Sequence, residues 1–463
     1  MIVALVMLQA SLPAAETSTS APLPGATNFI VIIADDMAWN DCGAYGHPSI
    51  HTPNIDQMAT EGMRFDRAFL TCSSCSPSRC SIMTGRYPHA TGAAELHMPL
   101  PAEQVMFTMP LRQAGYYTAQ AGKWHMGKDA ESQFDKLYMG GGPSGCENWL
   151  KALRERPMDK PFFMWLASFD PHRGYKPNTF DPPHRREDVV VPPFLPDEPE
   201  VRDDLAMYYD EIARLDSYIG KVFAELKQQG VDDNTCVIFL SDNGRPFPRC
   251  KTLVVDSGVR TPFIVRWPDR VKAGSTCDSL VSSVDIAPTI VDLAGAKTLD
   301  SFQGVSFAPL LKDPRQTVRQ FVFSEHNWHD YEACERSARN ERYLYTRNWR
   351  PKLTASPPAD AVNSPTYRKM LELHDAGKLP PKMSQPMMAP QPPEQLFDVV
   401  SDPYQMNNLA DDPQHAGTLK QMRRVMDDWR DRTGDELVEP LTPDWFDRRT
   451  GKKLGKGARP TGR

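Results

Sequence analysis

The sequence lacks any hydrophobic run long enough to cross a membrane as a helix. The one apolar stretch at the N-terminus is short and is followed by a segment rich in Ser, Thr, Pro and Ala. This pattern is typical of a secretory signal with a linker, although no Lys or Arg precedes the apolar run. We therefore interpret residues 1–27 as a signal peptide and linker. We expect an exported protein, whether periplasmic, secreted or lysosomal, that has no membrane span.

An excess of positive charge is also absent. The 53 Lys and Arg residues are outnumbered by 59 Asp and Glu, and the net charge of -6 argues against a nucleic-acid partner. Only residues 448–463 are strongly basic, with seven Lys and Arg and no acidic residue. We interpret this end as a flexible, solvated tail, with binding to a polyanion as the alternative.

The cysteines lack the spacing of a zinc site. Cys72, Cys75 and Cys80 lie close together, but no second pair of ligands accompanies them. Nine cysteines leave disulfide pairing possible, and the sequence does not determine which would pair.

Several segments are continuously apolar, which is typical of parallel strands buried on both faces. Between two of them, apolar residues recur at steps of three and four from Leu205 to Leu226, which predicts a helix that ends before Gly230. Alternating strands and helices predict a large, doubly wound, mostly parallel α/β sheet, assigned to residues 28–314. The expected strands are Phe29–Ala34, Tyr116–Ala121, Pro161–Ala167, Cys236–Leu240 and Pro262–Trp267.

A smaller unit of a different kind is expected over residues 315–447. Glu341–Asn348 and Gln395–Pro403 have the pattern of antiparallel strands, and Gly417–Arg432 has the pattern of a helix that covers them. We predict a C-terminal α+β subdomain with an antiparallel sheet.

Polar residues follow the predicted strands of the large sheet. Asp35 and Asp36 follow the first, Asp242 and Asn243 follow another, and open α/β sheets place their sites at such strand ends. The four side chains offer hard oxygen ligands, which suit Ca²⁺ and, less well, Mg²⁺.

The segment CSPSRCSIMTGR, residues 75–86, predicts an anion site beside a thiol. Ser76 is a suitable N-cap, Pro77 suits the first helical position and Gly85 suits the helix end. Cys75 would then lie at the mouth of a short helix, where free N–H groups attract an anion, and Arg79 adds a cationic fork.

This string resembles the signature C-x-P-S-R followed by T-G-R of the sulfatase family, within the alkaline-phosphatase superfamily. The resemblance extends from about residue 28 to about residue 413 and implies an alkaline-phosphatase-like fold. It also implies that a formylglycine-generating or sulfatase-maturing enzyme oxidises Cys75 to formylglycine, whose hydrate is the nucleophile. One divalent cation, calcium first, would be held by Asp35, Asp36, Asp242, Asn243 and the oxygen of residue 75.

The resemblance also implies roles for further residues, with Arg79 favouring the ionised hydrate. Lys123 and His125 lie in GKWHMG, where Lys123 would contact sulfate and His125 would be the base that regenerates the aldehyde. His172 in FDPHR would face the leaving-group atom. Lys251 precedes Arg260 by nine residues, as in the family stretch whose lysine bridges sulfate and leaving group.

Within the family, the chain is most similar to the sulfamidases, the N-sulfoglucosamine sulfohydrolases. The shared pieces are SSCSPSR, FDPHR, SDNGRPFP and SPTYRKMLELHDAG, but sulfamidases carry arginine where this chain has Lys251. We expect a sulfated saccharide as substrate, N-sulfated first and O-sulfated second. Glu325, His326 and His329 could contact the sugar, or could be structural residues at a strand end.

Three other functions stay open on the sequence. The first is a formylglycine-dependent phosphodiester or phosphonate hydrolase. The second is a metal-dependent phosphomutase or phosphatase of related fold, against which Cys75 in a full signature argues. The third is a non-catalytic sugar-binding protein, against which the complete set of site residues argues.

Overall fold

The computed structural model describes residues 25–437 and 441–455. The predicted signal peptide falls almost wholly on residues 1–24, which lie outside the described residues. Within the described part of the chain, no helix has the length and apolar character needed to cross a membrane. All nine cysteines are buried and none of them is paired.

A large sheet forms the centre of the molecule. The predicted mostly parallel, doubly wound arrangement is confirmed, with β1 paired in parallel to β6 on one side and β7 on the other. Across the sheet the eight strands follow the order β5 (Lys136–Met139), β4 (Tyr117–Gly122), β6 (Phe162–Ala167), β1 (Asn28–Ala34), β7 (Thr235–Ser241), β8 (Phe263–Arg266), β2 (Met63–Phe65) and β9 (Ser275–Cys277).

One predicted strand has the wrong direction. Strand β8, expected to be parallel over Pro262–Trp267, runs antiparallel to both β7 and β2. An apolar run shows that a strand is buried on both faces, but it carries no information on strand direction. The direction is set by the connection, in which the chain returns from β7 through residues 242–262 to the neighbouring position.

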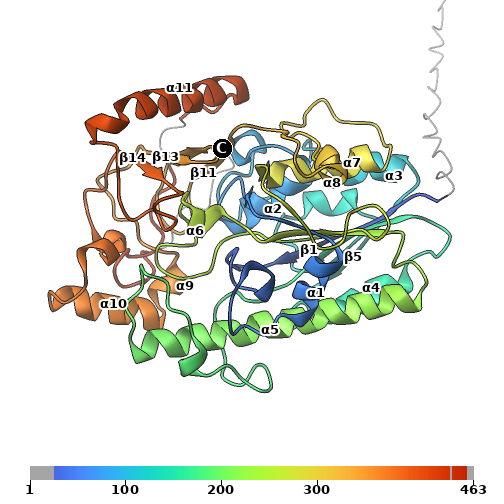
Figure 1. Cartoon of the computed structure of the whole chain (residues 1–463), viewed down its shortest axis with the longest axis horizontal. Helices are drawn as coiled ribbons and strands as arrows, with labels where there is room; N and C mark the ends of the chain where they lie inside the picture. The colour runs from blue at the N-terminus through green and yellow to red at the C-terminus, as the bar shows by residue number, and fades with distance from the viewer. Residues whose placement is uncertain (1–24, 438–440, 456–463) are drawn as a thin grey trace, which may run out of the picture.

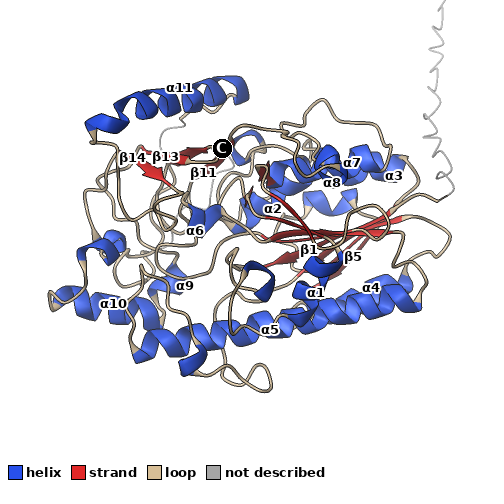
Figure 2. Cartoon of the chain, in the orientation of Figure 1, coloured by secondary structure: helices blue, strands red, loops and turns tan. Residues whose placement is uncertain are grey.

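Helices cover both faces of the sheet, which explains why its central strands are apolar throughout (Figures 1 and 2). Phe29, Val31 and Ile33 belong to the core on one face, and the alternate residues of β1 belong to the core on the other. The first face packs against α2 (Cys75–Thr84), α3 (Thr108–Gln113), α7 (Ile286–Leu293) and α8 (Ala308–Lys312). The second packs against α1 (Pro53–Glu61), α4 (Trp149–Glu155) and α5 (Pro199–Gln228).

The predicted C-terminal antiparallel sheet is also present. Its four strands follow the order β11 (Val322–His326), β12 (Glu335–Arg339), β13 (Tyr343–Asn348) and β14 (Glu394–Asp398). Helix α11 (Ala416–Thr433) covers this sheet with a buried stripe at steps of three and four, made by Leu419, Met422, Met426 and Trp429.

Short elements connect the two sheets. Strands β3 (Ala68–Phe69) and β10 (Val281–Ser282) pair in parallel, and α6 (Asp256–Val259) precedes β8. Helices α9 (Ala359–Val362) and α10 (Pro365–Asp375) extend back to α5, where the Thr366 hydroxyl donates to Asp204 at 2.6 Å.

The basic tail begins later than we predicted. Arg448 donates to Asp444 at 2.7 Å and to the Thr354 carbonyl at 2.6 Å, and its guanidinium lies over the ring of Tyr331. These contacts hold the chain at residue 448 against the C-terminal unit. Residues 456–463, which carry the last three of the seven basic residues, lie outside the described residues.

Candidate active site

The ends of four neighbouring strands bring the predicted site residues together. Strands β4, β6, β1 and β7 are adjacent and parallel, so their carboxyl ends share one edge of the sheet. Lys123 follows β4, His172 follows β6, Asp35 follows β1 and Asp242 follows β7. The prediction that polar side chains gather at these strand ends is therefore confirmed.

Helix α2 brings Cys75 to this edge. The helix ends at Gly85 with φ 64°, as expected, but it begins two residues earlier than we predicted. Ser74, with extended backbone, occupies the N-cap position, and Ser76 lies inside the helix, where its hydroxyl accepts a hydrogen bond from the His97 N–H at 2.8 Å. Cys75 is therefore the first helical residue, where backbone N–H groups lack helical partners.

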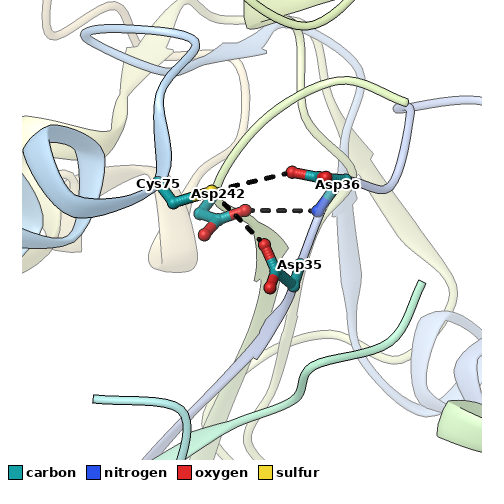
Figure 3. A group of neighbouring side chains, drawn as sticks. All are labelled: Asp35, Asp36, Cys75 and Asp242. Carbon is teal, nitrogen blue, oxygen red and sulfur yellow. Dashed lines mark hydrogen bonds between the residues drawn. The ribbon is translucent and has the colours of Figure 1, made fainter. Parts of the chain in front are cut away.

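The Cys75 sulfur lies among three carboxylates (Figure 3). It is 3.5 Å from Asp35 Oδ1 and 3.8 Å from Asp36 Oδ1, and the Asn243 amide nitrogen is 3.3 Å away. The ligand atoms of Asp35, Asp36, Cys75 and Asp242 all lie within 4.8 Å of one another, and all four residues are buried. We call these four residues and Asn243 the strand-end cluster.

Three cationic side chains pair with the carboxylates of the strand-end cluster. Arg79 donates to Asp242 through Nε at 2.8 Å, and Lys251 donates to Asp36 at 2.7 Å. Lys123 donates to Asp35. Because three carboxylates face three cations, a divalent ion here would give the site a surplus of positive charge, which suits an anionic substrate.

Burial controls the ionisation of the cluster. Burial raises the pKa of the Cys75 thiol well above its ordinary value, against the lowering effect of Lys123 and Lys251. Burial also tends to raise the pKa of Asp35, but Lys123, His172 and Arg79 outweigh burial, so that this pKa is lowered. Burial raises the pKa of Asp36 to about 6 although Lys251 opposes it. Since the thiolate is the nucleophilic form of cysteine, an unmodified Cys75 is poorly suited to attack a substrate.

The donor set of the strand-end cluster fits a hard cation. Asp35, Asp36 and Asp242 provide carboxylate oxygens, which Ca²⁺ and Mg²⁺ prefer. The Asn243 side-chain oxygen is buried and has no hydrogen-bond partner among the described residues. Its nitrogen points to Asp36 Oδ1 at 2.7 Å and Asp242 Oδ1 at 2.8 Å. A half turn of this amide exchanges the two atoms and adds a fourth oxygen ligand.

His125 lies beside the cluster as a neutral base. Its Nε2 is 2.7 Å from Nδ1 of His97, and its buried Nδ1 contacts no partner in the part of the chain that the structure describes. Burial, Lys123 and His97 lower the pKa of His125 well below its usual range. A neutral imidazole near Lys123 and Asp35 can accept a proton during a reaction at residue 75.

His172 presents one defined nitrogen to the site. Its Nδ1 donates to the Arg173 carbonyl at 2.5 Å, which directs Nε2 towards Asp36 Oδ2 at 3.8 Å and Asp360 Oδ2 at 3.6 Å. A cavity of about 570 Å³ adjoins the ring and is also lined by Asp35 and Lys123. The cavity is large enough for a sugar-sized ligand and opens directly onto the cluster.

The three residues suggested for sugar contact lie in different environments. Glu325 is fully buried and bonds to His89 at 3.0 Å, so it faces away from the cavity. This environment agrees with the alternative prediction, that Glu325 is a structural residue. His326 is also buried, and neither ring nitrogen has a partner. Of the three, only His329 lies beside α2, with Nδ1 2.8 Å from the Ser74 hydroxyl.

Two site residues were missed in the sequence. His97 contacts His125, and Asp360 approaches His172 from the C-terminal unit. His97 follows a stretch without a recognisable pattern, and Asp360 lies in a proline-rich segment far along the chain. The only signal near Asp360 was the adjoining SPTYRKMLELHDAG segment, which we had matched to sulfamidases.

Comparison with known proteins agrees with this geometry. The family model described as Sulfatase matches residues 27–296, and the model described as N-sulphoglucosamine sulphohydrolase, C-terminal, matches residues 250–353. The N-sulphoglucosamine sulphohydrolase of Homo sapiens is 30% identical over an alignment covering 89% of this chain and 91% of the human protein. An ulvan-active sulfatase of Formosa agariphila is 29% identical, with 92% of this chain and 78% of that protein covered.

A solved structure shares the fold at lower sequence identity. It is a protein in complex with its substrate D-glucosamine-2-N,6-O-disulfate, with a TM-score of 0.67 and 20% identity. The alignment covers 89% of this chain and 99% of that one.

Proposed function

The chain belongs to the sulfatase family, and from this premise we propose that it hydrolyses the N-sulfate of glucosamine through a formylglycine made from Cys75. The observation that carries the chemistry is the position of Cys75, at the first turn of α2 and 3.5 Å from Asp35, with a thiol pKa raised by burial. The preference for N-sulfate is supported by the match of residues 250–353 to the C-terminal model of the sulphohydrolases and by the human relative.

The proposal includes one divalent cation held by Asp35, Asp36, Asp242 and Asn243, together with the oxygen of residue 75. We expect Ca²⁺ first and Mg²⁺ second, because carboxylate and amide oxygens in a buried pocket suit the larger ion. When present, the cation and the hydrated aldehyde supply a nucleophilic oxygen that a buried thiol does not offer.

The cationic side chains of the chain bind and orient the sulfate. Lys251 and Lys123 have almost no exposed surface and point their ammonium groups into the cluster. They stabilise charge on the sulfate oxygens in a site from which water is largely excluded. Arg79 is fully buried behind Asp242 and holds this carboxylate in place.

Two histidines move protons at different points. His172 presents Nε2 next to the cavity, so we assign it the proton that the leaving nitrogen takes up. His125 is neutral because burial, Lys123 and His97 lower its pKa, so we assign it the proton that residue 75 must lose when the aldehyde is restored.

The proposed function has one requirement in the host, and export is a separate prediction. Conversion of Cys75 needs a formylglycine-generating or sulfatase-maturing enzyme as a partner. Export of the chain remains a prediction from residues 1–27.

A second candidate function is hydrolysis of O-sulfated sugars. Lys251 stands where the sulfamidase pattern has arginine, and an alkoxide leaving group needs a stronger proton donor than an amine does. A compact ammonium paired to Asp36 at 2.7 Å could help to meet that need. The ulvan-active relative supports this alternative.

The test compares substrates on one preparation that carries formylglycine. N-sulfoglucosamine, 6-O-sulfo- and 2-O-sulfo-saccharides and a phosphodiester are assayed side by side, with Cys75→Ala as the blank. We expect N-sulfoglucosamine to have the highest kcat/KM. Turnover of an O-sulfate alone would leave a sulfatase and remove the N-sulfate proposal, and turnover of the phosphodiester alone would remove both.

A further inference from the structure

The C-terminal unit contributes one carboxylate to the leaving-group side of the site. Asp360, on α9, accepts the Ala361 N–H at Oδ1 at 2.7 Å, whereas its Oδ2 accepts no hydrogen bond from any residue that the structure describes. That oxygen lies 3.6 Å from Nε2 of His172, and the side chain is 30% exposed. A carboxylate oxygen with free lone pairs therefore lies beside His172 Nε2, the nitrogen to which we assign the leaving-group proton.

The position of Asp360 is fixed through a shared anchor. Asp204 on α5 accepts two hydrogen bonds from Arg173, each at 2.8 Å, and one from the Thr366 hydroxyl at 2.6 Å. Arg173 follows His172 directly, and Thr366 lies on α10, just after α9. The same buried carboxylate therefore holds both the loop that carries His172 and the segment that carries Asp360.

The negative charge of Asp360 weakens the binding of sulfate and strengthens only the binding of a cation. The surrounding groups on every neighbouring element are Lys251, His172, Arg173, Asp36 and Asp330. Although burial acts upward, Lys251, His172 and Arg173 lower the pKa of Asp360, so it stays ionised. A fixed negative charge repels the sulfated substrate, but it attracts an ammonium group at the same place.

We propose that Asp360 binds the amino group of the departing sugar and thereby selects amino-sugar leaving groups, an inference that rests on the proposed N-sulfate activity. As the N–S bond breaks, its electron pair stays on nitrogen while sulfur bonds to the oxygen of residue 75. His172, as an imidazolium that also donates from Nδ1 to the Arg173 carbonyl, gives its Nε2 proton to the nitrogen, which becomes an amine. A second proton from the solvent makes it an ammonium. Asp360 Oδ2 then accepts a hydrogen bond from that ammonium.

The inference can be tested by product inhibition on the formylglycine enzyme. Glucosamine, N-acetylglucosamine, glucose and inorganic sulfate are compared as inhibitors of the wild type and of Asp360→Asn, below the pKa of the glucosamine amine. We expect glucosamine to bind the wild type more tightly than the two neutral sugars, and Asp360→Asn to lose about tenfold in affinity for glucosamine alone. Inhibition by sulfate should stay constant or strengthen.

Asp375→Asn serves as the matched control, because Asp375 is an exposed acid on the adjoining α10 that pairs with Arg449. It should leave all four inhibition constants unchanged. Equal inhibition of the wild type by glucosamine and glucose would overturn the inference without any variant. Equal weakening of all inhibitors in Asp360→Asn would also overturn it, since that pattern indicates a role in positioning His172 only.

The outcome is separable from that of the proposed function. If the enzyme hydrolyses only O-sulfates, the N-sulfate proposal fails, and the glucosamine preference of the wild type still decides whether Asp360 binds an amine. If N-sulfoglucosamine is the best substrate but Asp360→Asn retains full kcat/KM and full glucosamine affinity, the function stands and the role of Asp360 is refuted.

Discussion

Two buried ionic clusters in this molecule have similar composition and different consequences. The strand-end cluster gathers Asp35, Asp36, Asp242, Asn243 and Cys75. The second, which we call the seam cluster, joins the turn after α2 to the C-terminal sheet and α11, and it gathers His89, Glu325, Arg336, Arg430 and Asp435. In both, His, Cys or acidic ligand atoms lie close enough together to hold a metal ion.

The difference lies in whether every polar atom has a hydrogen-bond partner and whether a cavity adjoins the cluster. In the seam cluster Arg336 bonds both oxygens of Asp435 at 2.7 Å, Arg430 adds a further contact at 3.1 Å, and Glu325 bonds to His89. The strand-end cluster instead leaves the Asn243 oxygen without a partner and adjoins a cavity of about 570 Å³. A closed network holds two parts of the fold together, whereas an incompletely paired one retains capacity for an ion and a substrate.

The largest effect is expected at the centre of the strand-end cluster. Cys75→Ala should reduce sulfatase activity to background, because no other residue can supply the nucleophilic oxygen. Cys80→Ala, on the same helix and buried in the core, should keep activity in the folded fraction. The check is kcat on formylglycine-competent preparations of both variants. Retained activity in Cys75→Ala would refute the assignment of residue 75.

The next largest effect is expected when a carboxylate is removed, and it should differ between the two clusters. Asp242→Ala should abolish bound divalent cation and activity together, because it deletes an oxygen ligand and releases Arg79. Asp435→Asn in the seam cluster should leave the metal content unchanged. Elemental analysis of the two purified variants and the wild type measures this. A full complement of metal in Asp242→Ala would show that the ion binds elsewhere.

In the seam cluster the effect should fall on stability. Arg336→Met leaves Asp435 and Glu325 buried with less compensation, so the free energy of unfolding should drop by about 3–5 kcal/mol. Arg423→Met breaks an exposed pair with Glu394 and should cost about 0–1 kcal/mol. Denaturant unfolding gives both values. The interpretation fails if Arg336→Met is as stable as its surface control.

The smallest effect is a pH dependence at His89. Burial tends to lower the pKa of His89, but Glu325 and Asp435 outweigh burial, so that this pKa is raised. Its Nδ1 faces Glu325 and its Nε2 faces the Thr433 carbonyl at 3.3 Å, which suits an imidazolium that donates from both nitrogens.

This raised pKa fixes the sign of the effect. The stabilisation is complete below the unfolded pKa of about 6.5 and is lost as pH rises through the raised folded value. The stability difference between the wild type and His89→Gln should therefore be largest, about 1–2 kcal/mol, at low pH and should shrink towards alkaline pH. Melting curves from pH 5.5 to 8.5 would show this trend, and a difference that grows with pH would contradict it.

The sequence predicted the strand-end cluster better than its surroundings. Apolar runs located β1, β4, β6 and β7, and parallel packing then required the residues that follow them to meet at one edge. The direction of β8 was wrong because burial on both faces is the same for either direction. The helix cap was misplaced because Ser74 and Ser76 are both suitable, and the contact of Ser76 with His97 decides between them.

The residues that close the site could not be predicted in the same way. Asp360 reaches His172 only because α10 docks on α5 through Asp204, a contact between distant parts of the chain. Glu325 was suggested as a sugar contact, with a structural role at a strand end as the alternative, and its side chain points into the seam cluster. Which way a strand-end side chain points depends on partners that no local pattern specifies.

The central claim is that the buried residue 75 acts as an aldehyde hydrate within a cation-binding cluster. The most direct measurement is mass spectrometry of the peptide that contains residue 75, on a preparation whose sulfatase activity is measured in parallel. We predict an aldehyde in place of the Cys75 thiol, with activity proportional to the converted fraction across preparations. An active preparation in which every copy of residue 75 is an unmodified cysteine would contradict the account.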